Sequence, residues 1–216
     1  MKFRAFCIAA VAAAFASAPL SAQENSGEEV EFEVKGETFV LQIPEGYCAP
    51  EGSGALIAKQ FADADSANLT PVNLQRCGSY GEDYIMIKTP RQMPAVPIAK
   101  SIFIEIMANE MQKGQSVKEG LDQGKRDVDT VTDGKLDMDL GGIGYAGSDD
   151  QCAYLAGVAD VAVEGGGAGT VAVGSCGTLV GTRHFFVHAY MAEGDASTID
   201  ELKARSRAVS LQITRK

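Results

Sequence analysis

The cysteines place the strongest constraint on the fold. Of the five, Cys7 lies in an N-terminal segment that reads as a cleaved export signal, and an exported chain is expected to join the other four, Cys48, Cys77, Cys152 and Cys176, as two disulfides. Three pairings are open. We favour Cys48–Cys77 and Cys152–Cys176, since each pair brackets one compact stretch of sequence. A metal site is the alternative, but the chain has no Cys-x-x-Cys pair and both of its histidines lie in one short segment. We therefore expect no metal.

The N-terminus has the pattern of a secretory signal peptide covering Met1–Ala22. Lys2 and Arg4 precede an uncharged, alanine-rich run that is too short to span a hydrocarbon core about 30 Å thick. Small residues before Gln23 suit a signal peptidase, so we expect the mature chain to begin there. An uncleaved anchor is the alternative. Because Gln23 stands where a lipoprotein needs cysteine, the mature protein should carry neither a lipid nor a membrane span, and we expect it to be periplasmic or secreted.

Residues 23–216 are of a length that suits a single domain with a substantial core. The whole chain has 19 basic and 29 acidic residues, a formal net charge of −10. Cleavage would also remove Lys2 and Arg4, and with them two positive charges. An acidic surface repels nucleic acid and anionic membranes, so neither is expected as a partner.

The order of predicted elements indicates an α+β fold, in which helices pack over a largely antiparallel sheet as an α/β/α sandwich. Period-two alternation predicts strands, and apolar residues at spacings of three and four predict helices. The predicted strands are 30–34, 39–43, 70–76, 84–88, 143–146, 152–163, 170–180 and 184–192. The predicted helices are 55–67, 97–114, a weaker one within 116–132, and a terminal one that opens with the capping-box pattern Thr198–Glu201 and includes Ile213.

The helix predicted for 97–114 carries a broad apolar surface. Ile98, Ile102, Ile106 and Met107 share one face, which Phe103 and Met111 widen. We expect this face to pack flat on the sheet, because core packing is commoner than a groove for a partner.

The segment from His184 to Ala192 alternates in a way that is typical of a central strand with two apolar faces. His184, Phe186, His188 and Tyr190 fall on one face, and Phe185, Val187 and Ala189 on the other. Four residues along a strand span about 13 Å, which is too far for the two histidines to share a metal ion. His184, His188 and Tyr190 are the candidate lining of a pocket, and structural histidines are the alternative.

Three tempting motifs each lack an essential part. Gly174–Gly177 resembles the nucleophile turn of a cysteine protease, but no histidine precedes it and a disulfide explains Cys176 better. Asp129–Leu140 resembles a calcium loop whose closing carboxylate is missing. The glycine run Gly165–Gly169 lacks the lysine and hydroxyl of a phosphate loop. The sequence therefore indicates no catalytic residue and no cofactor.

The mature chain resembles the Mog1/PsbP-like domains in element order. The resemblance rests on the N-terminal hairpin that closes on Ile43–Tyr47, and on the return through Gly181–Tyr190 into a final amphipathic helix. It implies an α/β/α sandwich around an antiparallel sheet. It also implies an accessory, scaffold or chaperone-like binding role without a catalytic motif.

Taken together, these features predict an exported, non-enzymatic accessory or binding protein of the bacterial cell envelope, whose partner is another envelope protein. The alternative is a small-molecule-binding or hydrolytic protein with a pocket near His184, His188 and Tyr190.

Overall fold

The computed structural model describes residues 27–79 and 81–216. The expected signal peptide, residues 1–22, lies outside the described residues. No helix within the described ranges combines the length and the apolar character that a membrane crossing requires.

The described chain forms eleven strands, four α-helices and one short 3₁₀ helix. In chain order the elements are β1 (Glu29–Val34), β2 (Glu37–Gln42), β3 (Tyr47–Cys48), α1 (Gly52–Ala64), β4 (Asn68–Arg76), β5 (Asp83–Pro90), α2 (Lys100–Lys113), α3 (Gln115–Thr132), β6 (Leu136–Asp139), β7 (Ile143–Ser148), β8 (Ala153–Val163), β9 (Ala168–Val180), β10 (Arg183–Ala192), η1 (Ala196–Thr198), α4 (Ile199–Leu211) and β11 (Ile213–Arg215).

Two antiparallel sheets form the framework of the fold. The larger has eight strands in the order β3-β4-β5-β10-β9-β8-β6, with β7 also paired to β8; the smaller is β1-β2-β11. The described strand pairs are all antiparallel. The predicted α+β class with a largely antiparallel sheet is therefore confirmed.

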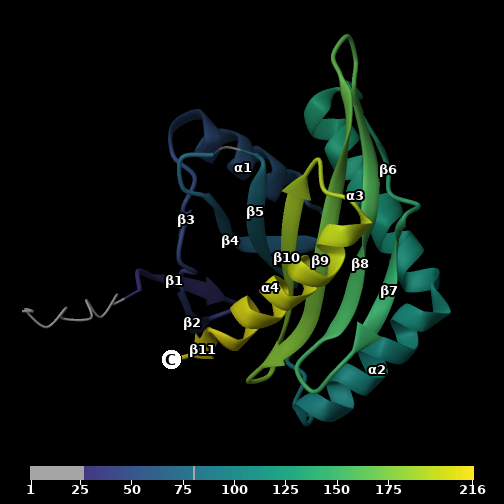
Figure 1. Ribbon diagram of the computed structural model, residues 1–216. Coiled ribbons are helices and arrows are strands. Elements are labelled where there is room, and N and C mark those ends of the chain that lie inside the picture. The colour runs from purple at the N-terminus through teal and green to yellow at the C-terminus, as the bar shows by residue number, and fades with distance from the viewer. Residues whose placement is uncertain (1–26, 80) are drawn as a thin grey trace, which may run out of the picture.

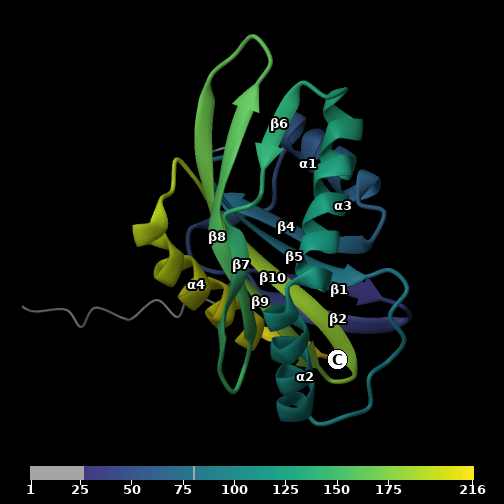
Figure 2. The same ribbon diagram turned by 90° about the vertical axis from the view of Figure 1, so that its right-hand side faces the viewer.

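Helices cover both faces of the large sheet. Helix α4 crosses one face over β9 and β10, whereas α2 packs on the other face against β7, β8 and β9 (Figure 1). Figure 2 shows α4 on one side of the sheet and α1, α2 and α3 on the other. Helix α3 contacts α1, α2 and β6 and has no buried residue. The central strand β10 is thus enclosed between helix layers.

The core divides into two clusters, one on each face of the large sheet. The larger lies under α4 and the small sheet, where Phe185, Val187 and Ala189 of β10 are fully buried. The smaller lies under α2 and includes Phe103, Ile104 and Leu179. The same strands contribute residues to both clusters, because successive side chains of a strand point to opposite faces of the sheet.

Two disulfides join the cysteines in the favoured pairs. Cys48–Cys77 links β3 to the end of β4, and Cys152–Cys176 links β8 to β9 in the interior. Disulfides of this kind are typical of proteins from oxidising compartments.

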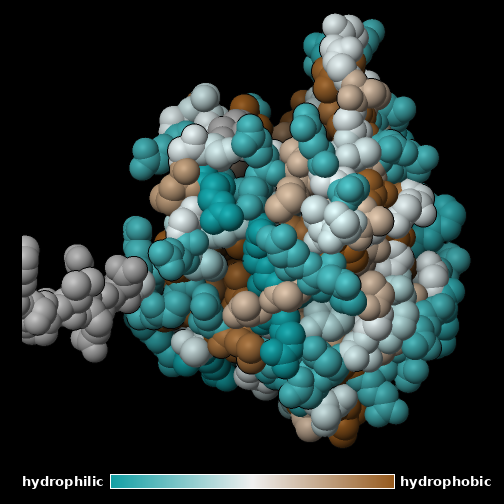
Figure 3. Space-filling view, in the orientation of Figure 1, coloured by the Kyte–Doolittle hydropathy of each residue, from teal (hydrophilic) through white to brown (hydrophobic). Residues whose placement is uncertain are grey.

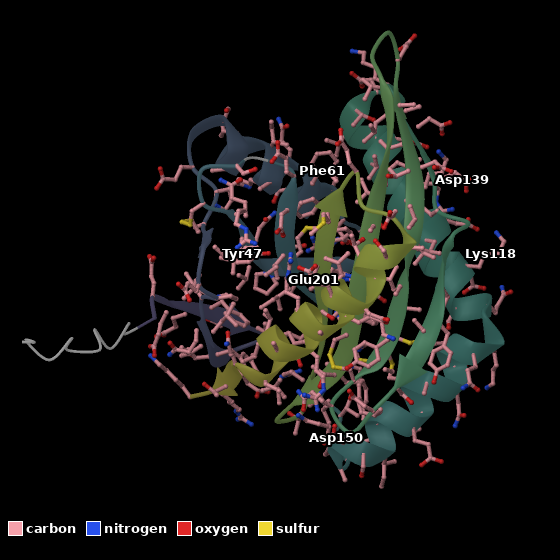
Figure 4. The ribbon with its side chains drawn as sticks, viewed as in Figure 1. Tyr47, Phe61, Lys118, Asp139, Asp150 and Glu201 are labelled. Carbon is pink, nitrogen blue, oxygen red and sulfur yellow. A yellow bond between two sulfur atoms is a disulfide. The ribbon has the colours of Figure 1, made fainter. Side chains whose placement is uncertain are left out.

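A polar cluster fastens β3 and β5 to α4. The Tyr47 hydroxyl donates to Asp83 Oδ1 at 2.6 Å, and Arg205 Nη1 donates to both groups, at 2.7 Å to the tyrosine and 2.6 Å to the carboxylate. Arg205 Nη2 also donates to Glu201 Oε1, and the labels of Tyr47 and Glu201 mark this region of the molecule in Figure 4. Burial, together with the hydrogen bond to Asp83, raises the pKa of Tyr47. The tyrosine therefore stays neutral and can donate to the carboxylate.

The end of the chain differs from the prediction. Thr198 does not cap α4; its hydroxyl donates to the carbonyl of Asp195, and Asp195 Oδ1 accepts from the amide of Ser197 instead. The helix ends at Leu211, and Ile213 leaves it to pair with Leu41 in the small sheet. The spacing of Ile213 fits the helical stripe, but its pairing with β2 buries the side chain more completely than an exposed last turn would.

Gly174 allows α4 to lie directly on β9. A Cβ at this position would lie 2.5 Å from the backbone of Leu202 and Lys203, too close for any side chain. We expect Gly174→Ala to lower the free energy of unfolding by about 1–3 kcal/mol or more, because backbone rather than a flexible side chain must move. Gly144→Ala is the control, since a Cβ there has nothing within 4 Å. Urea unfolding followed by circular dichroism measures both; equal stability of the two variants would contradict the close approach.

Candidate functional site

The predicted pocket residues lie in one row along a single face of β10. His184, Phe186, His188 and Tyr190 stack in sequence, with ring centroids 4.4, 5.8 and 5.9 Å apart. Phe103 of α2 continues the row at one end and Tyr84 of β5 at the other. The predicted alternation of β10 is confirmed, and it brings the three candidate residues onto one surface.

His188 occupies the middle of this row and forms a hydrogen bond with Ser175, its cross-strand neighbour on β9. The distance from Ser175 Oγ to His188 Nδ1 is 2.7 Å. Burial, together with the nearby Lys88 ammonium, lowers the pKa of His188 to about 3. The imidazole is therefore neutral at pH 7 and a weak base, whereas efficient general bases have a pKa near the working pH.

His184 is almost fully buried beneath α2. Its Nδ1 lies 3.3 Å from Met93 Sδ, and its Nε2 is buried without a hydrogen-bond partner. Desolvation lowers the pKa of His184 to about 4. This histidine packs between Phe103 and Phe186, which is the structural alternative that the sequence left open.

The other end of the row is partly exposed. The Tyr84 and Tyr190 rings stack 4.6 Å apart, and desolvation raises the pKa of Tyr84 to about 12. Nearby, Lys88 Nζ forms an ion pair with Asp65 at 2.6 Å. Burial favours the neutral form of Asp65, but Lys88 and the hydrogen bonds from Asn68 outweigh it and hold the pKa of Asp65 below its usual range.

Among the described residues, this row lacks the complete set of groups that a hydrolytic centre uses. In residues 27–79 and 81–216 no carboxylate is hydrogen-bonded to either histidine, and Ser175 is only 3 % exposed. The Cys176 sulfur is held in a disulfide and is fully buried. A serine nucleophile needs a base of suitable strength and access to substrate. His188 is bonded to Ser175 but is a weak base, and Ser175 itself is enclosed. Nor do the described residues group three or more histidine, cysteine or carboxylate side chains as metal ligands.

Two surface depressions lie away from the row. One, of about 420 Å³, lies at the exit of β2 and includes Pro44, Gly46 and Tyr47 in its wall. The other, of about 230 Å³, lies beside the β6–β8 pairing and is lined by Asp137, Asp139 and Asp160. Neither brings together a nucleophile, a base and a cation.

Helix α2 turns Ile102 and Ile106 away from the core, contrary to the prediction, and Ile98 just before the helix is exposed as well. Phe103, Ile104, Ala108 and Met111 are the residues it buries against the sheet. Ile98, Ile102 and Ile106 are 37, 50 and 51 % exposed. The helix has large apolar residues on both sides, and the sheet accepts the side that carries the bulkier Phe103 and Met111.

The exposed isoleucines belong to a larger, mainly apolar surface at the start of α2. The connector from Gln92 to Ala99 contains no charged residue, and most of its apolar side chains are exposed. We define the α2 patch as the exposed apolar residues Pro94, Ala95, Pro97, Ile98, Ala99, Ile102 and Ile106. By contrast, the face that carries α4 is mainly hydrophilic, with small, separate hydrophobic areas (Figure 3).

The sequence contained a signal for this surface that the prediction missed. Isoleucines at 98, 102 and 106 were assigned to the same apolar face as Phe103 and Met107, although one helix can turn only part of its circumference towards a sheet. Exposed apolar residues that are grouped together mark interaction sites more often than scattered ones do.

Comparison with known proteins yields a likeness of fold alone. No family model matches the chain, and no curated protein is similar to it. The solution structure of cyanobacterial PsbP (CyanoP) from Synechocystis sp. PCC 6803 is similar over 92% of this chain and 100% of that one, with a TM-score of 0.40 and 11% sequence identity. A likeness at this level carries no functional conclusion, so function must be argued from the surfaces described above.

Proposed function

We propose that this chain is an exported, non-enzymatic binding protein of the bacterial cell envelope, periplasmic or secreted, which binds another protein through the α2 patch. The observation that carries the proposal is the exposure of Ile98, Ile102 and Ile106 beside a connector, residues 92–99, that contains no charged residue. Soluble monomers rarely leave contiguous apolar areas uncovered unless a partner uses them.

Two further features support export and binding. The pattern of Met1–Ala22 is that of a cleaved secretory signal, and the two disulfides fit an oxidising compartment. The neutral, weakly basic His188 and the enclosed Ser175 argue against hydrolysis, which leaves binding as the better explanation of the fold.

A small-molecule-binding role is the second candidate. The partly exposed stack of Tyr84 and Tyr190, with His188 beside it, favours this role because flat aromatic faces bind planar or apolar ligands. Such a ligand would perturb the Tyr84 and Tyr190 ring resonances and leave the isoleucine methyls of the α2 patch unchanged.

A photo-crosslinking amino acid placed in living bacteria tests the protein-binding role. We expect a crosslinker at Ile102 or Ile106 to capture a discrete second protein, because both side chains point outwards from α2. The same crosslinker at Ile57 on α1, which is 40 % exposed, is the matched control and should capture none. N-terminal sequencing of the purified protein should start at Gln23.

The protein-binding role would be contradicted if crosslinkers at Ile57 and Ile102 captured a second protein equally, or if neither captured one. An N-terminus at Met1 would remove the envelope location.

A further inference from the structure

The shape of the α2 patch selects the kind of element that fits it. Ile102 and Ile106 stand one turn apart on the outer side of a helix, about 6 Å along its axis. The connector 92–99 forms no strand, and a helix surface offers side chains but no free strand edge, so an extended peptide could not add to the patch as a further strand. Ridges of side chains on one helix fit the grooves of another, and the patch therefore suits a partner helix.

A single carboxylate defines the charge that this helix should carry. Glu105 is exposed on α2 three residues after Ile102, and no ion pair in the described part of the chain involves it. Glu110, further along α2, is already paired with Lys113. The whole chain is also acidic, with a formal net charge of −10. A lysine or arginine beside the apolar stripe of the partner would pair with Glu105 and be attracted by the whole molecule.

A second copy of this chain fits the patch less well. A two-fold contact places the same surface on both sides, so Glu105 enters it from each copy. Residues 92–99 offer no cation, and Lys100 Nζ is already bonded to Gln151 at 2.9 Å. Each carboxylate would be desolvated without a partner, which is costly.

We propose that the α2 patch binds an amphipathic helix of another protein, one with an apolar stripe and a lysine or arginine placed to meet Glu105. This inference rests on the proposed protein-binding function and names its partner class.

Two synthetic peptides serve as probes. Both are 18-residue amphipathic helices with a leucine stripe, one with lysine and the other with glutamate on the polar face. Titrated into the mature protein with ¹³C-labelled isoleucine methyls, the lysine peptide should shift the resonances of Ile98, Ile102 and Ile106. The glutamate peptide should bind at least about tenfold more weakly, the order of effect expected from a mispaired charge.

Matched variants distinguish binding at the α2 patch from nonspecific electrostatic attraction to the acidic protein. Ile102→Ser with Ile106→Ser should weaken the lysine peptide about tenfold or more, as removal of central apolar contacts does. Leu56→Ser with Ile57→Ser, an exposed apolar pair on α1, should not. Glu105→Lys should reverse the preference between the peptides, whereas Glu164→Lys, at the exposed β8–β9 turn, makes the same charge change and should leave the preference intact.

Three outcomes would overturn the inference. Equal binding of both peptides would show that Glu105 does not select the charge of the partner. Unaltered binding of the lysine peptide by the double serine variant would show that the α2 patch is not the binding site. Concentration-dependent dimers that the double serine variant abolishes would assign the patch to a second copy. If crosslinking at Ile102 in cells still captures another protein while the peptides fail, the binding function stands and only the helical, basic partner class is wrong.

Discussion

Acidification from pH 6.5 to pH 3 is expected to destabilise this protein by several kcal/mol through two histidines, the buried His184 and the partly buried His188. Their pKa is about 6.5 in the unfolded chain, and in the fold it falls to about 4 for His184 and about 3 for His188, in both cases mainly through desolvation. The folded state therefore binds fewer protons than the unfolded state in this range. The contribution of each histidine to the free energy of unfolding is fully present above pH 6.5 and is lost as the pH falls from 6.5 towards its folded pKa. For each histidine the loss is about 1.4 kcal/mol per unit by which its folded pKa lies below 6.5.

The groups that surround these histidines determine how the test is designed. Lys88, Asp65, Ser175 and Tyr190 face His188, and Asp65 loses its own stabilising ion pair at low pH. Acid unfolding alone would therefore mix carboxylate and histidine effects. A comparison of variants isolates the histidines, because the carboxylates are unchanged in all of them.

His188→Gln keeps a hydrogen-bonding group opposite Ser175 but cannot titrate, so its unfolding free energy should fall less steeply between pH 6.5 and pH 3. His184→Phe should flatten the curve between pH 6.5 and pH 4, without a loss of stability at pH 7, because it removes the unpartnered Nε2 from an aromatic surrounding. Urea unfolding at a series of pH values measures both. Parallel curves for all three proteins would show that the histidines are not buried as described.

Removal of the buried disulfide is expected to cost more than removal of the exposed one, although the two close loops of similar length. The bonded residues are 24 positions apart in Cys152–Cys176 and 29 apart in Cys48–Cys77. Loop closure alone gives each bridge about 3 kcal/mol of stabilisation. Cys152 and Cys176 are also fully buried, whereas Cys77 is exposed, so only the first pair leaves a core cavity when replaced by alanine.

We expect Cys152→Ala with Cys176→Ala to lower the free energy of unfolding by about 1–2 kcal/mol more than Cys48→Ala with Cys77→Ala does. The second double variant is thus the control for loop entropy. Urea midpoints measured without reductant give the comparison. Equal losses would show that packing around the Cys152–Cys176 sulfurs contributes nothing, and a smaller loss for the buried pair would contradict their burial.

The strand pattern and both disulfides could be predicted because each depends on local spacing. Alternation along β10 places His184, His188 and Tyr190 on one face whatever packs there, since strand side chains have a period of two. The cysteine pairs also follow from proximity along the chain. The hydrogen bond between Ser175 and His188 could not be predicted in this way, because it depends on the register of β9 against β10.

The faces of helices were harder to predict than those of strands. Phe103, Ile104, Ala108 and Met111 meet the sheet, while Ile102 and Ile106, assigned to the core, face outwards. A helix with apolar residues around most of its circumference does not specify its own orientation. Its packing against β7, β8 and β9 decides that orientation.

Local composition was sufficient for the α+β class, the alternation of β10 and the cysteine pairs, because these depend on backbone periodicity and on residues near one another in the chain. The α2 patch, the Tyr47–Asp83–Arg205 cluster and the departure of Ile213 into the small sheet depend on segments that meet only after folding. Their energies come from burial and pairing between those distant segments, and no local pattern records which surfaces will be left uncovered.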